Sequence, residues 1–293
     1  MKKSKKLITR TFQFILKNYL PNFFLKYFLF LRTFRKFKKT VKQPKIKKIF
    51  STNNLDKINN YEYKITSQNN EDGIIDYIFK IIPNQKYFCE IGFGYYEFNS
   101  LDLIKKGWSG QLIDANTLEV LALKANLAFF YPRTNIKILN NTVNKKNIND
   151  LLFQESEKKN IDFFSIDIDG NDYWVLKECN LNNISCVCLE YNHWLGRDSK
   201  KIMRYDENFN FVDNGIFGAS LLAFDNLMNS KGFKLIAVES SGTNAFYINE
   251  KFSHFFAILD PIKSFKSIGR FYSEEKKEKI FNNIKSSKLF FDI

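Results

Sequence analysis

Residues that bind zinc or form disulfide bonds are scarce in this chain. Its 293 residues include only two histidines, His193 and His254, and four cysteines, all of which fall within or beside apolar runs. No group of Cys and His has the spacing of a zinc site. Cys186 and Cys188 lie two positions apart in a predicted strand and therefore on the same face of it, which suits packing in a core better than a disulfide bond. These absences exclude a structural zinc site and indicate a reducing, cytoplasmic compartment.

Acidic residues are absent from the first 50 positions, which carry 16 of the 45 Lys and Arg residues. The remaining residues hold 29 basic against 31 acidic side chains, so the net charge of +14 belongs to this segment. A nucleic-acid-binding domain would build its positive face into the fold itself. The near-neutral body therefore argues against nucleic acid as a partner.

Long apolar runs are also missing from residues 1–50, because Lys17, Lys26 and Arg32 interrupt them before the ~18 to 20 residues that a bilayer requires. No small-residue cleavage site of a signal peptide follows. The interleaved basic and apolar residues predict a pair of amphipathic helices, broken near Pro21, that form a peripheral anchor on an anionic membrane surface. A helical extension packed on the domain, or a basic tail, is the alternative.

Strands and helices alternate through the body of the chain, which we expect to form one domain over residues 61–260. Apolar runs predict strands at 87–91, 111–114, 136–139, 161–168 and 186–190, and helical periodicity predicts helices at 74–82, 118–130 and 220–230. This order indicates an α/β fold in three layers, with a mostly parallel sheet between helices. The runs 233–238 and 245–248 flank a turn and predict an antiparallel carboxyl-terminal hairpin. Residues 263–293 predict a basic helical extension.

A glycine-containing loop follows the first predicted strand. Glu90 ends that strand, and Gly92 and Gly94 allow the backbone to approach a ligand at the start of a helix. Asp114 ends the next strand 22 residues after Gly92, the spacing of an acid that binds a ribose diol. Glu97 stands where a dinucleotide-binding loop would have its third glycine. The acidic Glu90 suits a positively charged ligand such as S-adenosylmethionine better than a pyrophosphate.

The chain resembles class I S-adenosylmethionine-dependent methyltransferases, and more closely the FkbM-like group, over about residues 61–260. The resemblance is carried by Ser67-Gln-Asn-Asn-Glu-Asp72, Phe88-Cys-Glu-Ile-Gly-Phe-Gly94, Gly107-Trp-Ser-Gly-Gln-Leu-Ile-Asp114, Ser165-Ile-Asp-Ile-Asp-Gly-Asn-Asp-Tyr-Trp174, Leu189-Glu-Tyr-Asn192 and Gly242-Thr-Asn-Ala-Phe246. Many FkbM-like chains read Asp-x-Glu-Gly where this chain has Asp167-Ile-Asp-Gly170. The resemblance implies a seven-stranded sheet whose last strand is antiparallel.

The resemblance also implies roles for particular residues. Glu90, Gly92 and Gly94 would cradle the methionine part of S-adenosylmethionine, and Asp114 would bind its ribose. Asn141 or Thr142 would lie near the adenine, and Asp167 beside the methyl group. Gln68 would close over the cofactor's carboxylate or, with Ser67, simply begin the first helix.

Residues at the ends of the fourth and fifth strands allow two ways of removing or polarising the proton of a hydroxyl acceptor. Asp167, Asp169 and Glu190 offer the oxygen ligands that Mg²⁺ prefers, and a magnesium ion would bind a sugar or polyol diol. His193 is the alternative, as a general base that titrates near neutrality. Asp172 more simply caps the helix that follows.

The resemblance implies oxygen methylation of a sugar, a glycolipid or a secondary metabolite. Residues 194–218, with Arg197, Arg204, Tyr205 and Asp206, follow the fifth strand and are expected to face this acceptor. One alternative function is a metal-dependent glycosyltransferase that uses the pair Asp167 and Asp169. Another is a non-catalytic adaptor at the membrane surface.

If residues 1–50 form a membrane anchor, deleting residues 1–45 should move the protein from the membrane to the soluble fraction of a cell lysate. The reason is that both the apolar insertion and the attraction to anionic lipids would be lost. Fractionation followed by immunoblotting measures this change. Unchanged partitioning would contradict the anchor.

Overall fold

The computed structural model describes residues 22–46, 57–153, 160–267 and 272–293, of which residues 22–30 are described by their backbone alone. The amphipathic helix expected before Pro21 lies outside these residues. Within the described parts of the chain, no helix combines the length and the apolar character that crossing a membrane requires.

A seven-stranded sheet forms the centre of the molecule. Its strands are β1 (Tyr87–Ile91), β2 (Ser109–Asp114), β3 (Ile136–Asn140), β4 (Ile161–Ile166), β5 (Ile184–Glu190), β7 (Phe233–Val238) and β8 (Asn244–Asn249). They lie in the order β3-β2-β1-β4-β5-β8-β7, and β8 runs antiparallel to both of its neighbours. All other pairings in this sheet are parallel. The predicted fold class is therefore confirmed, including the antiparallel hairpin of the methyltransferase-like sheet.

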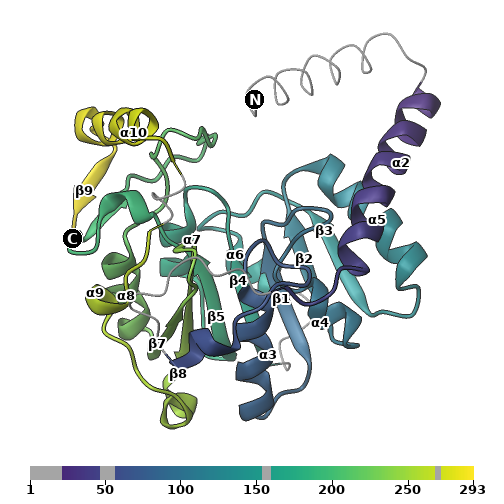
Figure 1. The fold of residues 1–293 in the computed structure, drawn as a ribbon, viewed down its shortest axis with the longest axis horizontal. Coiled ribbons are helices and arrows are strands. Elements are labelled where there is room, and N and C mark those ends of the chain that lie inside the picture. The colour runs from purple at the N-terminus through teal and green to yellow at the C-terminus, as the bar shows by residue number, and fades with distance from the viewer. Residues whose placement is uncertain (1–21, 47–56, 154–159, 268–271) are drawn as a thin grey trace.

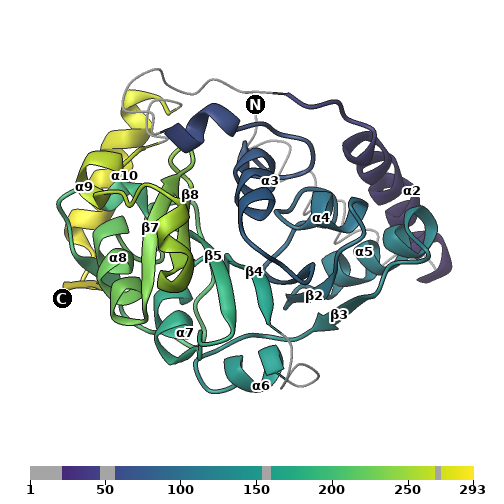
Figure 2. The same cartoon turned by 90° about the horizontal axis from the view of Figure 1, so that it is seen from below.

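Helices cover both faces of the sheet, as the alternation of elements predicts (Figure 2). One face carries α3 (Glu71–Ile81), α4 (Leu101–Lys105) and α5 (Thr117–Phe130). The other face carries α6 (Ile148–Phe153), α7 (Asp172–Glu178) and α8 (Leu221–Ser230). These three layers are the expected architecture, and each interface between layers has its own apolar core.

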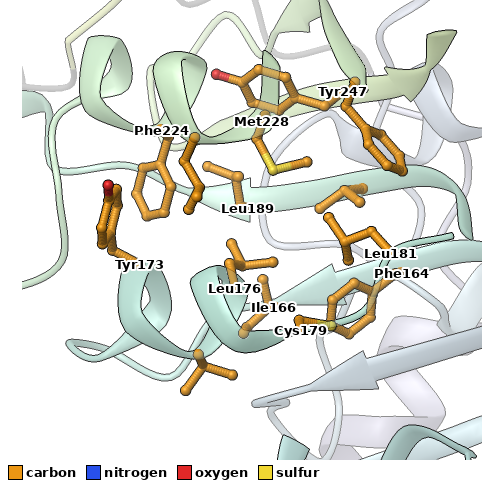
Figure 3. Close-up of a cluster of buried hydrophobic side chains, with 14 of the residues drawn as sticks. Phe164, Ile166, Tyr173, Leu176, Cys179, Leu181, Leu189, Phe224, Met228 and Tyr247 are labelled. Atoms are coloured by element: carbon orange, nitrogen blue, oxygen red, sulfur yellow. The ribbon is translucent and has the colours of Figure 1, made fainter. Parts of the chain in front are cut away.

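Alternation along the strands distributes side chains between the two cores. In β5, Cys186 and Cys188 pack toward the core beneath α3, whereas Val187 and Leu189 pack toward the core beneath α8. Figure 3 shows the second of these cores, in which Phe224 and Met228 of α8 lie over the sheet. All four cysteines are buried and unpaired.

The helix boundaries follow local capping chemistry in most places. Ser220 caps α8 by accepting from the backbone N–H of Ala223, and Asn116 caps α5 in the same manner. Asn70 is the residue before α3, but its side chain makes no capping hydrogen bond to the helix.

Helix α2 (Asn22–Val41) comes from the basic amino-terminal segment and packs against α5 at its carboxyl-terminal end (Figure 1). Phe37 is fully buried, and its ring centroid lies 5.3 Å from that of Phe130. Phe34 lies 4.9 Å from Phe129, centroid to centroid. The described side chains of this segment therefore rest partly on the domain, with Arg32, Arg35 and Lys36 exposed.

The chain between β5 and α8 forms an insertion that pairs with the carboxyl terminus. It contains the 3-10 helix η2 (His193–Leu195) and the strand β6 (Lys201–Met203). Strand β9 (Phe290–Asp292) pairs antiparallel with β6, and α10 (Glu274–Ser286) packs on η2. The sequence predicts α10 but not this two-stranded sheet, because each strand has three residues and its partner lies about 90 positions away. The smaller elements are η1 (Lys57–Tyr61), η3 (Glu250–Phe255) and α9 (Pro261–Ser264).

Candidate functional site

Two adjoining cavities lie where the carboxyl ends of β1, β2 and β4 meet. The first, here called the glycine-loop cavity, extends over Gly92, Gly94 and Gln68 and has a volume of about 370 Å³. The second, the β3-side cavity, extends over Asn141 and Thr142 and has a volume of about 280 Å³. They share a boundary formed by Gly92, Asp114, Asn116, Asp167 and Asp169. Cavities of this size at the carboxyl edge of a parallel sheet are typical of small-ligand sites.

The boundary between the cavities depends on the close approach of two strand ends. Gly92 adopts a positive φ of 77°, and a Cβ atom there would lie 1.7 Å from the carbonyl oxygen of Asp167. The backbone N–H of Asp167 in turn donates to the carbonyl oxygen of Ile91 at 2.9 Å. Only glycine fits this position, both because of its φ and because of the adjacent carbonyl.

Asp114 holds the glycine loop in place. Its Oδ2 accepts from the backbone N–H of Phe93 at 3.0 Å, and its Oδ1 accepts from that of Asn116 at 2.6 Å. Each carboxylate oxygen has a second lone pair, so Asp114 retains acceptor capacity for hydroxyl groups in the cavities. Glu119 acts similarly, since its Oε2 accepts from the N–H of Tyr95 at 2.6 Å.

Glu90 lies at the base of the glycine-loop cavity and is 2% exposed. Its two oxygens accept from the backbone N–H groups of Asn99 and Ser100, at 3.0 and 2.7 Å. Burial nonetheless raises the pKa of Glu90 to about 7, because the hydrogen bonds offset only part of the lost hydration. The carboxyl group therefore titrates near neutral pH.

The glycine-loop cavity is strongly acidic. Six of its described lining residues are Asp or Glu, and none is Lys or Arg: Glu90, Glu97, Asp114, Glu119, Asp167 and Asp169. Glu97 pairs with the nearly buried Lys64. Such a lining favours a ligand that carries positive charge and disfavours a diphosphate.

The carboxylates of Asp167, Asp169 and Glu190 converge, as the sequence predicts for neighbouring strand ends. One oxygen from each lies within 4.8 Å of the others. Burial, followed by repulsion from Asp169, raises the pKa of Asp167 well above its usual range, and burial followed by repulsion from Asp167 does the same for Glu190. A proton or a cation would relieve this repulsion, so the group has the donor chemistry of a hard metal ion.

His193 differs from the expectation of a base that titrates near neutrality. It is 6% exposed, and burial lowers its pKa to about 4. Its Nε2 has no hydrogen-bond partner among the described residues, and its ring lies 4.6 Å from that of Trp194, centroid to centroid. His193 is absent from the described lining of both cavities. His193 is buried because of the tertiary packing around η2. The sequence around His193 contains no local pattern that predicts this burial.

Asp172 also differs from its expected role as a helix cap. Its carboxylate accepts from the N–H groups of Ile168 and Gly170, at 2.8 and 2.9 Å, and so closes the turn that precedes α7. Asn171 occupies the cap position, but its side chain bonds to the backbone of Asp206 instead of the helix. Asp172 therefore shapes the turn that presents Asp169, whose φ is 61°.

The insertion after β5 contributes to the site only in part. Tyr205 lines the β3-side cavity, whereas Arg197 pairs with Asp198 at the surface and Arg204 lies over the ring of Phe291. Phe209, from the same expected segment, also lines the β3-side cavity, whereas Glu119 and Asn244 line the glycine-loop cavity without having been expected there. Asn244 has its position because β8 lies beside β5, and its side chain donates to Glu71 at 2.8 Å. The sequence does contain a clue to the position of Glu119, because it lies in the first turn of the helix that Asn116 caps.

The raised pKa of Glu90 predicts a pH-dependent contribution to stability. Its ordinary value is 4.5 and its value in the folded protein is about 7, so the folded state binds more protons than the unfolded state between these limits. Ionisation of Glu90 should therefore destabilise the protein as the pH rises through this window, by on the order of 2 kcal/mol between pH 5 and 7.5. Urea unfolding of the wild type and of Glu90→Gln at both pH values measures the effect.

Glu90→Gln also loses an acceptor for one backbone N–H, but that cost is independent of pH. The difference in free energy of unfolding between the two proteins should thus shift in favour of Glu90→Gln at the higher pH. An equal difference at both pH values would show that Glu90 does not titrate there.

Comparisons with known proteins assign no family to the chain. No protein-family model and no curated protein matches the chain. Among solved structures, similarity extends to magnesium protoporphyrin IX methyltransferase from Synechocystis PCC 6803 with bound S-adenosylmethionine, at 8% identity and a TM-score of 0.39, over 61% of this chain and 77% of that one.

Two further structures are similar at comparable levels. An S-adenosylmethionine-dependent methyltransferase from Clostridium acetobutylicum is 9% identical, with a TM-score of 0.41 over 61% of this chain and 90% of that one. A human methyltransferase 10 domain containing protein is 10% identical, with a TM-score of 0.42 over 61% and 81%. At these levels the sheet order of the protein itself, rather than any one similarity, is what identifies a class I methyltransferase-like fold.

Proposed function

We propose that this protein is an S-adenosylmethionine-dependent methyltransferase, related to the FkbM-like group, that methylates a hydroxyl oxygen. The observation that carries the proposal is the glycine-loop cavity, which combines a backbone loop, an acid at the end of β2 and six acidic lining residues without a basic one among its described members. A ligand with a sulfonium and an ammonium group matches this charge, and a nucleotide diphosphate does not.

The protein's own groups would hold the cofactor by polar contacts around its charged and hydroxylated parts. Glu90 and the loop at Gly92 and Gly94 would enclose the methionine end, with Gln68 near its carboxylate, and Asp114 would accept from the ribose hydroxyls. Asn141 and Thr142 would meet the adenine edge in the β3-side cavity. S-adenosylmethionine, when bound, supplies a methyl group on a positively charged sulfur that is open to attack by a nucleophile.

Asp167 is our candidate for receiving the proton of the acceptor hydroxyl. It lies on the boundary of the two cavities, and burial raises its pKa, which makes the ionised carboxylate a stronger base than an ordinary aspartate. Glu190 would assist by sharing that proton across the cluster. His193 is less suited to this role, since burial lowers its pKa to about 4. The expectation of a sugar, glycolipid or secondary-metabolite acceptor rests on the FkbM-like resemblance.

A magnesium ion bound at the same three carboxylates is a second way of activating the acceptor hydroxyl. Asp167, Asp169 and Glu190 would hold it through one oxygen each, and the ion would supply Lewis-acid polarisation of a bound hydroxyl or diol. The mutual repulsion of the three carboxylates is the observation that favours it.

Binding of an adenosyl ligand tests the proposed function. The wild-type protein should bind S-adenosylhomocysteine in isothermal titration calorimetry, and Asp114→Ala should weaken binding about tenfold or more, because the hydroxyl acceptor and the anchor of the Phe93 N–H are both removed. Asp150→Ala is the matched control, since Asp150 is exposed on α6, away from both cavities.

Nucleotide sugars titrated in the same way address the glycosyltransferase alternative. Binding of a nucleotide sugar in place of the adenosyl ligand would refute the methyltransferase proposal, and binding of neither ligand would favour the adaptor. Adenosyl binding that is equal in Asp114→Ala and Asp150→Ala would refute the assigned site.

The magnesium proposal predicts that Mg²⁺ raises the melting temperature of the wild type, because an ion that binds only the folded state stabilises it. With the ion at tenfold its dissociation constant the gain is about 1.4 kcal/mol. Glu190→Gln, which keeps the shape of the side chain and removes one charged ligand, should abolish most of the shift. A shift of the same size in both proteins, or in neither, would contradict the metal site.

We also propose that the basic segment, residues 1–50, contacts an anionic membrane surface. The exposed Arg32, Arg35 and Lys36 of α2 support this, in a helix without acidic residues. The deletion of residues 1–45 described above tests it.

A further inference from the structure

We infer that the insertion between β5 and α8 supplies an aromatic wall, formed by Phe209, against which the adenine base of the cofactor packs, and that the carboxyl-terminal residues 272–293 hold this wall in place. The inference rests on the proposed function and extends it to residues outside the sheet edge. It is carried by the lining of the β3-side cavity and by the contacts that fasten the insertion to the β4 turn.

The chemistry of the β3-side cavity suits a planar base. Ile113, Ala115, Val143 and Ile168 give it apolar walls, and the amide and hydroxyl groups of Asn141 and Thr142 stand at its side. Phe209, Tyr205 and Glu207 line it from the insertion. A flat heteroaromatic ring with polar edges matches apolar faces and polar sides together.

Phe209 sits directly on the turn that carries the acids. A Cβ atom at Gly170 would lie 2.4 Å from a carbon of the Phe209 ring, so the ring rests on the bare backbone of Gly170. Any larger residue at position 170 would push the ring away. Glycine at this position therefore permits the contact that brings Phe209 to the cavity.

Hydrogen bonds fasten the insertion to the same turn. The side chain of Asn171 donates to the carbonyl oxygen of Asp206 at 2.7 Å and accepts from its N–H at 3.2 Å. The N–H of Gly218 donates to the carbonyl oxygen of Gly170 at 3.2 Å. On the far side, Lys145 lies 4.4 Å from the ring centroid of Tyr205. The insertion thus bridges the β4 turn and the segment after β3.

The carboxyl-terminal residues support the other side of Phe209. Trp194, Phe217 and Ile280 form a small buried cluster, and Phe209 packs against it. Ile280 belongs to α10, and α10 is continued by β9, which pairs with β6. The N–H of Arg204 also donates to the carbonyl oxygen of Leu289 at 2.7 Å. Phe209 therefore lies between the cavity and a core that the carboxyl terminus completes.

Calorimetric titration of the full chain with S-adenosylhomocysteine and with 5′-methylthioadenosine tests the wall. Phe209→Ala should weaken both ligands by a similar factor of about ten, because both carry the adenine that the ring contacts. Phe209→Leu, which keeps apolar packing on the cluster, should show a smaller loss. Phe255→Ala is the control, since Phe255 is 45% exposed on η3 and is not among the residues that line either cavity.

A double-mutant cycle tests the support from the carboxyl terminus. Ile280→Ala should weaken S-adenosylhomocysteine about threefold in the wild-type background and have no further effect in Phe209→Ala, because Ile280 acts through Phe209. The melting temperature of the unliganded proteins should fall with Ile280→Ala in both backgrounds. This second readout separates positioning of the wall from a general loss of stability.

Three outcomes are decisive. No binding of either ligand by the wild type would overturn the proposed function, and the inference with it. Binding by the wild type with equal affinities for Phe209→Ala, Phe209→Leu and Phe255→Ala would overturn the aromatic wall alone. Equal losses from Ile280→Ala in the two backgrounds would overturn the role of the carboxyl terminus.

Discussion

The close approach of Gly92 to the carbonyl group of Asp167 is the constraint on which the whole site depends. It brings the glycine loop of β1 and the acidic turn of β4 into contact, and the N–H of Gly92 donates at the same time to the carbonyl oxygen of Ile113 in β2. Three strand ends are thereby fixed relative to one another. The two cavities share their boundary at this junction, so ligands in both would meet the same few backbone atoms.

Several carboxyl groups around this junction are buried at an electrostatic cost. Burial raises the pKa of Glu90, of Asp114 and of the pair Asp167 and Glu190, which means that each is held in a place where its charged form is disfavoured. Backbone N–H groups offset part of the cost for Glu90 and Asp114. A positively charged ligand would relieve the remaining cost, so the acids that are costly to bury would also make the site selective for such a ligand.

The periphery of the fold extends the site beyond the sheet. The insertion after β5 is anchored by Asn171 to the acidic turn and by β9 and α10 to the carboxyl terminus. At the opposite end, α2 packs on α5, the helix that begins at the cap Asn116. Both extensions pack on elements that directly follow strands lining the cavities. A structural change in either extension would therefore act on the cavity lining through few intervening residues.

The sequence by itself determined the sheet and its helices, because apolar alternation and helical periodicity are local and cores form wherever those faces meet. It also placed Gly92, Asp114 and the β4 acids at one edge, since the carboxyl ends of parallel strands converge. Only the tertiary structure decided the burial of His193 in η2 and the packing of Phe209 on Gly170. The pairing of β6 with β9 belongs to the same group. These features depend on residues far apart in the chain, and the pKa values and contacts that they set arise only when the chain brings those residues together.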